Sequence, residues 1–427
     1  MNIEESLGML DTEKGTDVLY KIYGNDAEKE KKRYEKVLAG YKESFGDNEI
    51  KLFTSPGRTE VCGNHTDHNH GKVLAGSINL DCVCAAGKNG TEKINIISES
   101  FNQKFTIDLS DLSEGQRHSG TVELTKGIVK AFENEGFKAG GFDAYITSNV
   151  IASAGVSSSA SYEMLICSVI NELFNDGKTD VVRYAHMGKY SENVYWKKAS
   201  GLMDQMACAV GGLIALDFEN PEAPSVEKVD FDFGSKNYDM IMVQTGKGHA
   251  DLSEEYSSIP EEMKKVAEFF KKSCLRELSE EELLEHIPEV RSFAGDRAVM
   301  RALHFFEENK RVDRAVEALT KNDFDSALKV ITESGNSSWK WLQNVYVTGA
   351  KEEQGICVAL ALTEIYLSKL GKGACRVNGG GFAGVIQVFV PHEAAEDYVS
   401  YIDKAMGEGS AHVMKIRSVG AVCLDRI

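Results

Sequence analysis

The first residues that could do chemistry lie in one short segment, GNHTDHNHG, at positions 63–71. It holds three histidines and an aspartate within nine residues. Their spacing does not match a helical metal motif such as H-E-x-x-H, and no obvious second group of ligands stands elsewhere in the sequence. A metal site is therefore the weaker interpretation, and another ligand must explain so many polar groups on one loop.

A second candidate segment is SAGVSSSASYEM, at residues 153–164. A glycine followed by serines and a helix-forming run predicts a tight loop that opens a helix, where backbone N–H groups and the helix dipole favour phosphate oxygens. The hydroxyls add donors, and one could ligate a phosphate-bound Mg²⁺. Serine is also a common N-cap, so the alternative is that Ser157, Ser158 and Ser159 only cap the helix. One cap needs one serine, which leaves the run after Gly155 in need of a further explanation.

A glycine cluster occupies RVNGGGFAGVIQVFV, at residues 376–390, and satisfies G-x-G-x-x-G at Gly379, Gly381 and Gly384. The dinucleotide fingerprint must run from a strand into a helix, whereas the strand-like VIQVFV follows here and little chain remains for a dinucleotide domain. We therefore reject that interpretation. The glycines are predicted to let a loop between two strands approach an active site closely.

The fourth segment is GLMDQMACAVGG, at residues 201–212, and it places Asp204 just inside a predicted helix start. A carboxylate there is ordinary, because it interacts favourably with the helix dipole. Glu192 lies twelve residues earlier, on a different predicted helix. Neither carboxylate is informative by itself.

The elements that must position these segments follow from hydrophobic periodicity and turn residues. Strands are predicted in the first half and again near the end, with an almost wholly helical stretch at 260–345. This pattern describes an α+β chain whose two sets of strands build neighbouring domains with the ligands in the cleft between them. Helices are predicted at 26–45, 120–135, 159–175, 180–197, 352–370 and 393–407, and strands within 72–98 and at 142–150, 211–218, 239–246, 374–378 and 385–390.

The composition restricts the class of protein. The chain has 427 residues, a length that suggests two to three domains. Its composition, 42% hydrophobic and 27% charged, is that of an ordinary globular protein. A net charge of −18 argues against binding to nucleic acid or to an anionic membrane.

The acidic N-terminus lacks the features of a signal peptide, and the longest apolar run, 206–216, is too short to span a bilayer. The scattered cysteines indicate reduced thiols, so we expect a cytoplasmic protein, and no protein partner is implied.

The segments PGRTEVCGNHTDHNHG, SAGVSSSAS, SGLMDQ and RVNGGGFAG together resemble the galactokinase branch of the small-metabolite kinases known as the GHMP superfamily. They occur in the same order and at similar distances, and the resemblance runs from about residue 26 to the last strand, including RALHFFEENKRVDRAVEAL at 301–319. It implies a two-domain fold of this α+β class, divided into 26–220 and a largely helical 221–427 with a small sheet, with the active site in the interdomain cleft. It also implies transfer of the γ-phosphoryl group of ATP, with Mg²⁺, to the anomeric hydroxyl of D-galactose.

The resemblance assigns the catalytic and phosphate-binding roles. Asp204 corresponds to the base near the anomeric hydroxyl, and Arg58 lies beside it, where it would keep Asp204 ionised and offset charge on the transferring oxygens. Ser159 corresponds to the serine near Mg²⁺ and Glu192 to its acidic partner. The loop around the ATP phosphates would comprise Gly155, Val156, Ser157, Ser158, Ser159 and Ala160, and Gly379, Gly380 and Gly381 would line the same cleft.

In galactokinases the loop that corresponds to GNHTDHNHG holds sugar hydroxyls, each of which needs both a donor and an acceptor. By this resemblance His65 and Asp67 contact the sugar, as does Tyr256 in LSEEYSS. His68 and His70 lie outside the matched contacts and are expected to be structural or exposed.

One position departs from the family, since galactokinases usually have a glutamate before the histidine that reaches the C6 hydroxyl, and this sequence has Asn64. A neutral asparagine repels a C6 carboxylate less, so one hypothesis is a specificity relaxed or shifted toward galacturonate or L-arabinose. The alternative, which we favour, is that Asn64 donates to the same hydroxyl.

A second class of function is a sugar- and ATP-binding sensor without catalysis, since some galactokinase relatives act as transcriptional co-inducers. Such a protein would lack residues of the serine loop or the catalytic aspartate. GVSSSAS, Arg58 and Asp204 are all present here, so catalysis is favoured. HTDHN and the helical insertion also favour the sugar branch over mevalonate or homoserine kinases.

Overall fold

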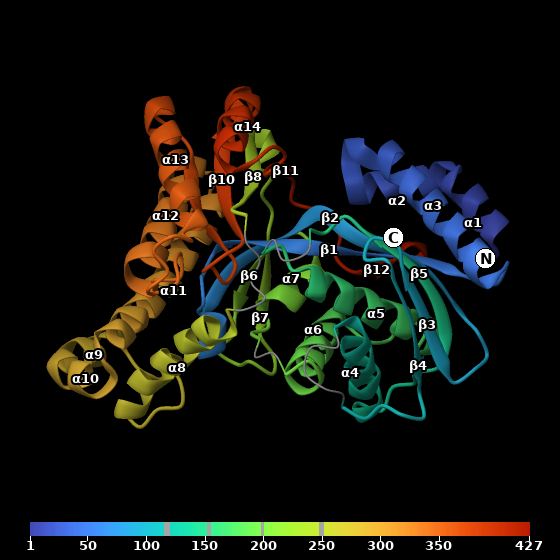
Figure 1. Cartoon of the computed structure of the whole chain (residues 1–427), viewed down its shortest axis with the longest axis horizontal. Helices are drawn as coiled ribbons and strands as arrows, with labels where there is room; N and C mark the ends of the chain where they lie inside the picture. The colour runs from blue at the N-terminus through green and yellow to red at the C-terminus, as the bar shows by residue number, and fades with distance from the viewer. Residues whose placement is uncertain (115–119, 152–154, 198–199, 247–251) are drawn as a thin grey trace.

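The computed structural model describes residues 1–114, 120–151, 155–197, 200–246 and 252–427. Its strands form an eight-stranded sheet and a four-stranded sheet, which lie beside each other with helices on both of their faces (Figure 1). This arrangement confirms the predicted α+β class. Residues 153–154, the first two of the predicted serine loop, lie outside the described residues.

The larger sheet has the order β12-β1-β2-β5-β3-β4, with β6 and β7 added beside β2. Side chains alternate along a strand, so Cys84 and Ala86 of β2 pack into the core with α4 to α7, while Val83 and Ala85 pack against α1 to α3. Both faces are covered, so β2 is buried along almost its whole length. The strands are β1 (Lys51–Cys62), β2 (Lys72–Lys88), β3 (Lys93–Ser98), β4 (Gln103–Asp108), β5 (Phe142–Ser148), β6 (Leu213–Asp217), β7 (Ser225–Val229) and β12 (Val422–Cys423). The helices are α1 (Ile3–Leu10), α2 (Glu13–Tyr23), α3 (Ala27–Phe45), α4 (Thr121–Asn134), α5 (Ser158–Phe174), α6 (Val181–Tyr190) and α7 (Met203–Val210).

The smaller sheet is antiparallel, with the order β11-β8-β10-β9. Ile241 and Val243 of β8 pack with α13 and α14, whereas Met240 and Met242 face the core that includes α12. The strands are β8 (Tyr238–Gln244), β9 (Ala374–Asn378), β10 (Val385–Pro391) and β11 (Ala411–Met414). The helices are α8 (Ser253–Phe269), α9 (Glu280–Glu285), α10 (Ile287–Ala294), α11 (Asp296–Thr320), α12 (Phe324–Ser337), α13 (Gly355–Leu370) and α14 (His392–Met406).

A buried ion cluster ties the N-terminal helices to the larger sheet. Asp81 of β2 is completely buried and accepts hydrogen bonds from Arg417 (2.5 Å), Tyr23 (2.6 Å) and Thr54 (2.5 Å), and it pairs with Arg33 of α3. Burial alone would raise the pKa of Asp81, but the two arginines and the donated hydrogen bonds hold it below its usual value. The carboxylate is therefore ionised in the core.

Most of the predicted helices and strands are confirmed, with bounds that differ by a few residues from those predicted. The helix predicted at 180–197 ends at Tyr190 and continues as a π-helical turn, Ser191–Tyr195. The sequence did not predict two helices and five strands: α1, α2, β1, β4, β7, β11 and β12. β7 and β12 join the larger sheet from beyond residue 220, so the division of the chain at that residue stays a proposal. No helix among the described residues is long and apolar enough to cross a membrane.

Candidate active site

The centre of the site is a bidentate ion pair between Arg58 of β1 and Asp204 in the first turn of α7. Arg58 Nε and Nη2 each donate to one Asp204 carboxylate oxygen at 2.6 Å. The arginine is buried, while the Asp204 side chain keeps 30% of its surface exposed. Ser157 Oγ donates a further hydrogen bond to the same carboxylate. The pair is therefore held rigidly by the protein and still accessible from one side.

The local sequence of β1 explains how the serine loop reaches this pair. The register with β2 shifts between Pro56 and Arg58. At Gly57, between them, a Cβ would lie 2.7 Å from the carbonyl oxygen of Val156, so a larger residue would push the loop away. The Arg58 N–H donates to that carbonyl at 3.1 Å, and the guanidinium donates to the Gly155 carbonyl. The glycine is needed for this close approach.

The serine loop turns into α5 as the sequence predicts. Gly155 and Ser157 have φ angles of +66° and 58°, and α5 begins at Ser158. No side chain in the described part of the chain caps this helix, so its first backbone N–H groups point to the loop. Val156 and Ala160 are buried and can offer only backbone groups, whereas the three serines are half-buried. This is the arrangement that suits phosphate oxygens.

Ser159 and Glu192 lie together, as expected for a metal-binding pair. Ser159 Oγ donates to Glu192 Oε1 at 3.0 Å, and Gln205 Nε2 donates to Glu192 Oε2 at 3.2 Å and to Glu163 at 3.1 Å. A hydroxyl and a carboxylate are hard oxygen donors, which fit Mg²⁺. Among the described residues no group of three or more His, Cys, Asp or Glu could hold a metal alone. The donor set therefore fits an ion that is also held by phosphate and water.

The predicted sugar-binding loop, residues 63–71 (the sugar loop), brings His65 and Asp67 toward the same site. His65 Nε2 donates to the Gly380 carbonyl at 2.8 Å, and Nδ1 lies 3.4 Å from His68 Nε2. Burial lowers the pKa of His65, so the ring is neutral near pH 7. Asp67 accepts from the N–H groups of His68 (3.0 Å) and Leu202 (3.2 Å), one on each oxygen. Each oxygen retains a lone pair, so Asp67 can still accept from sugar hydroxyls.

Tyr256 and the glycine loop between β9 and β10 complete the cluster. Tyr256 donates to the Gly381 carbonyl at 2.9 Å, and its ring packs so tightly on Gly380 that a Cβ there would lie 3.0 Å from the ring atom Cδ1. Gly379 and Gly381 have φ angles of +68° and +80°. A strand, β10, follows the loop, which confirms that the glycines are not a dinucleotide fingerprint.

Asn64 is a predicted sugar contact whose side chain is bound by neighbouring protein groups in this structure. Its side chain is completely buried, and its amide N–H groups donate to Glu60 Oε2 (3.1 Å) and to the Gly379 carbonyl (2.7 Å). Its oxygen accepts from Asn344 (2.7 Å) and Ser338 (3.2 Å). Both amide N–H groups are used within the protein in this structure, so donation by Asn64 to a sugar hydroxyl stays a prediction that would require one of these bonds to be exchanged.

Sequence reasoning missed several polar residues behind the site, including Gln205, His304 and Glu308. His304 and Glu308 lie on α11, within the segment 301–319 that carries part of the resemblance to galactokinases. Arg301, His304, Glu308 and Arg311 recur at intervals of three and four, which places them on one helix face, and all are buried. A buried polar face of this kind was the available signal.

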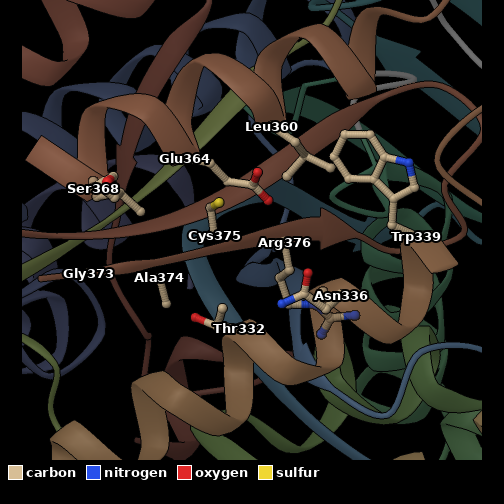
Figure 2. Close-up of a pocket in the computed structure, with 12 residues that line it drawn as sticks. Thr332, Asn336, Trp339, Leu360, Glu364, Ser368, Gly373, Ala374, Cys375 and Arg376 are labelled. Carbon is tan, nitrogen blue, oxygen red and sulfur yellow. The ribbon is translucent and has the colours of Figure 1, made fainter. Parts of the chain in front are cut away.

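A separate pocket of about 200 Å³ lies between α12, α13 and β9 (Figure 2). Glu364, Trp339 and Cys375 are among the residues that line it. The described residues that line this pocket include none of the predicted site residues. Arg376 also lines this pocket, and its guanidinium donates to Glu60 Oε1 at 2.7 Å.

Similarity to known proteins agrees with this geometry. The galactokinase galactose-binding signature matches residues 39–88, and the GHMP kinases N-terminal domain matches residues 123–212. A galactokinase of Lactococcus lactis, solved in complex with galactose, aligns over 90% of this chain and 98% of that one, with a TM-score of 0.76 and 24% identity. A mevalonate kinase aligns over 86% of this chain with a TM-score of 0.60 and 15% identity. The fold is that of the GHMP kinases.

The sequence relatives define the family within this class. A galactokinase of Clostridium tetani is 31% identical over 349 residues, which make up 80% of this chain and 84% of the relative. A galactokinase of Pyrococcus furiosus is 29% identical over 346 residues, or 80% of this chain and 89% of the relative. The chain belongs to the galactokinase family.

Proposed function

We propose that the protein is a cytoplasmic kinase that transfers the γ-phosphoryl group of ATP to the anomeric hydroxyl of D-galactose. The observation that carries this proposal is the bidentate Arg58–Asp204 pair, which stands beside the start of α5 and is partly open to solvent. Phosphoryl transfer needs a positioned acceptor hydroxyl and cations near the transferring oxygens, and the pair supplies a group for each need.

Asp204 receives or orients the proton of the anomeric hydroxyl. Arg58 fixes both carboxylate oxygens, and Ser157 donates to one of them, so the carboxylate is held in one orientation before substrate binds. The guanidinium charge favours the ionised form of Asp204 and offsets negative charge that builds on the reacting oxygens. Holding the hydroxyl in line accounts for a large part of the acceleration in such reactions.

The start of α5 binds the phosphates of ATP. Backbone N–H groups and the hydroxyls of Ser157 to Ser159 serve as donors there, because the loop lacks the lysine of a Walker P-loop. Ser159 and Glu192, which are hydrogen bonded to each other, would hold Mg²⁺ beside the phosphates. When bound, the ion neutralises charge on the phosphates.

Asp67 and His65 bind the sugar hydroxyls. Asp67 accepts from two adjacent hydroxyls, and the neutral His65 exchanges its hydrogen bond to the Gly380 carbonyl for one to the sugar. The amide donors of Asn64 bind Glu60 and the Gly379 carbonyl, so direct donation to the C6 hydroxyl needs an exchange of one of these bonds, as for His65. A comparison of sugars that differ at C6 tests this step.

The test is the formation of ADP by purified protein with Mg²⁺ATP and each of galactose, galacturonate, L-arabinose and N-acetylgalactosamine, with ³¹P NMR of the products. We expect galactose 1-phosphate as the main product. Faster turnover of galacturonate or L-arabinose would move the proposal to that sugar. Galactose binding by calorimetry without any sugar phosphate would instead identify a sensor.

A further inference from the structure

A completely buried polar cluster lies directly behind the sugar loop. It is built from the polar face of α11, which supplies His304, Glu308 and Arg311, and from Glu60 of β1 and Arg376 of β9. Glu308 and Glu60 are balanced by Arg311 and Arg376, to which they are paired at 2.6 and 2.7 Å. Such a cluster costs desolvation energy, so its retention calls for a reason other than stability.

The contacts of Glu308 supply that reason. Its Oε1 accepts hydrogen bonds from the backbone N–H of Gly63 at 2.9 Å and of Asn64 at 3.4 Å, and from the hydroxyl of Ser334. Burial would raise the pKa of Glu308, but His304, Arg311 and Arg376 hold it well below its usual value. An ionised carboxylate oxygen therefore stands under two successive amides of the loop, immediately before His65.

His304 holds the next peptide group of the loop. Its Nε2 is 2.8 Å from the Asn64 carbonyl, which can only accept, so Nε2 carries the proton. Nδ1 must then accept from Ser337 Oγ at 2.8 Å, which agrees with the donation of Arg311 Nη2 to the same hydroxyl oxygen at 2.7 Å. Burial lowers the pKa of His304 to about 4, so the ring keeps this neutral tautomer near pH 7.

These bonds fix both sides of the Asn64 peptide unit just where the loop turns. Gly63 has a φ angle of +103°, and His65, which is not a glycine, adopts a φ angle of 57°. A non-glycine residue in the left-handed region is strained by about 1–3 kcal/mol and persists where its surroundings hold it. Glu308 and His304 are those surroundings, since they bind the backbone immediately before the strained residue.

We infer that Glu308 and His304 are positioning residues for sugar binding, which act by holding the backbone of the sugar loop so that His65 and Asp67 meet the substrate. The inference rests on the proposed sugar-kinase function. It predicts that weakening these bonds impairs the use of galactose and leaves the use of ATP unchanged.

The sharpest test is the pair His304→Gln and His304→Asn. A glutamine can place its amide nitrogen near the position of Nε2 and keep the bond to the Asn64 carbonyl, whereas an asparagine reaches only the position of Nδ1, toward Ser337. Both variants remove the imidazole ring from the same core site. They are therefore distinguished by whether the side chain can still donate to the Asn64 carbonyl. Glu308→Gln removes the anionic acceptor, and Glu307→Gln on the same helix is its matched control, since Glu307 pairs with the surface residue Lys310.

The readouts are KM for galactose, KM for ATP, kcat, the calorimetric Kd for galactose and the melting temperature. We expect His304→Asn and Glu308→Gln to raise the KM and Kd for galactose about tenfold. KM for ATP and kcat at saturating sugar should stay unchanged. His304→Gln, which can keep the bond to the Asn64 carbonyl, should lose less galactose affinity than His304→Asn, and Glu307→Gln should behave as the unmodified protein. Absence of turnover by the unmodified protein would overturn the proposed function, and its calorimetric galactose binding would still test this inference.

Equal behaviour of His304→Gln and His304→Asn toward galactose would overturn the inference, because it would show that only packing matters at this position. Equal losses for galactose and ATP would do the same. If Glu308→Gln fails to fold, the His304 pair still decides the outcome.

Discussion

Substitution of Gly201 by alanine should selectively weaken galactose binding. Gly201 precedes α7 by two residues, and an added Cβ would overlap Asp67 Oδ2 and lie 2.6 Å from its Cγ. Gly201 is not among the residues with positive φ, so alanine would add no backbone strain. The methyl group must therefore displace the Asp67 carboxylate from its position.

The size of the effect follows from the contact that would be lost. Moving the carboxylate breaks its hydrogen bond from the Leu202 N–H (3.2 Å) and, with it, the proposed hydrogen bond from the sugar; a hydrogen bond to a charged group is worth about 1.5–3 kcal/mol. Since about 1.4 kcal/mol corresponds to a tenfold change, the Kd for galactose should rise by about ten- to a hundredfold. The affinity for ATP should change little, because the serine loop is held by Arg58 and Asn378 instead.

Isothermal titration calorimetry with galactose and, separately, with an ATP analogue measures both quantities. Gly8→Ala in α1 is the control, since its Cβ would meet no described atom within 4 Å. An unchanged Kd for galactose, or an equal weakening of both ligands, would refute the assignment of Asp67 to the sugar.

Three further outcomes are expected. Arg58→Lys should lower kcat about a hundredfold with a small change in either KM, because lysine cannot hold both oxygens of Asp204; a steady-state assay with an unchanged kcat would contradict this. Ser159→Ala should raise the Mg²⁺ concentration needed for half-maximal activity about tenfold if this hydroxyl ligates the ion, and an unchanged Mg²⁺ titration would argue for another ligand. Asp81→Asn should reduce the free energy of unfolding by about 3–5 kcal/mol in urea denaturation at pH 7. Because the folded pKa of Asp81 is lowered, its stabilisation is present above the unfolded pKa of about 3.9 and is lost as the pH falls below it, so the difference between the two proteins should shrink in acid.

The sequence predicted the elements whose pattern reflects burial. The amphipathic α3 and the apolar β2 and β10 were predicted because each buries one stripe or both faces in a core. β1 was not predicted, although it lies in the centre of the site. Its sequence, KLFTSPGRTEVC, includes a proline, a glycine and two charged residues that form ion pairs, Arg58 with Asp204 and Glu60 with Arg376. Such residues interrupt the hydrophobic pattern by which a buried strand is predicted.

Candidate site residues could be named from the sequence where they stand in a segment that resembles the family. Contacts between elements far apart in the sequence could not be predicted in this way. Arg58 pairs with Asp204, and Ser159 is hydrogen bonded to Glu192. The position of Asn64 could not be predicted, because its four partners come from β1, the turn after α12 and the glycine loop, which are far apart in sequence. Only the packing of both sheets decides whether that amide faces a substrate or a neighbour.

The most direct test of the account is galactose-dependent ADP formation by the unmodified protein and by Asp204→Asn, with the galactose Kd of both measured by calorimetry. The account predicts turnover by the unmodified protein and a loss of about 10²–10⁴-fold in the variant, with galactose binding retained. An Asp204→Asn variant that turns over galactose as fast as the unmodified protein would contradict the central claim that this carboxylate serves the transfer.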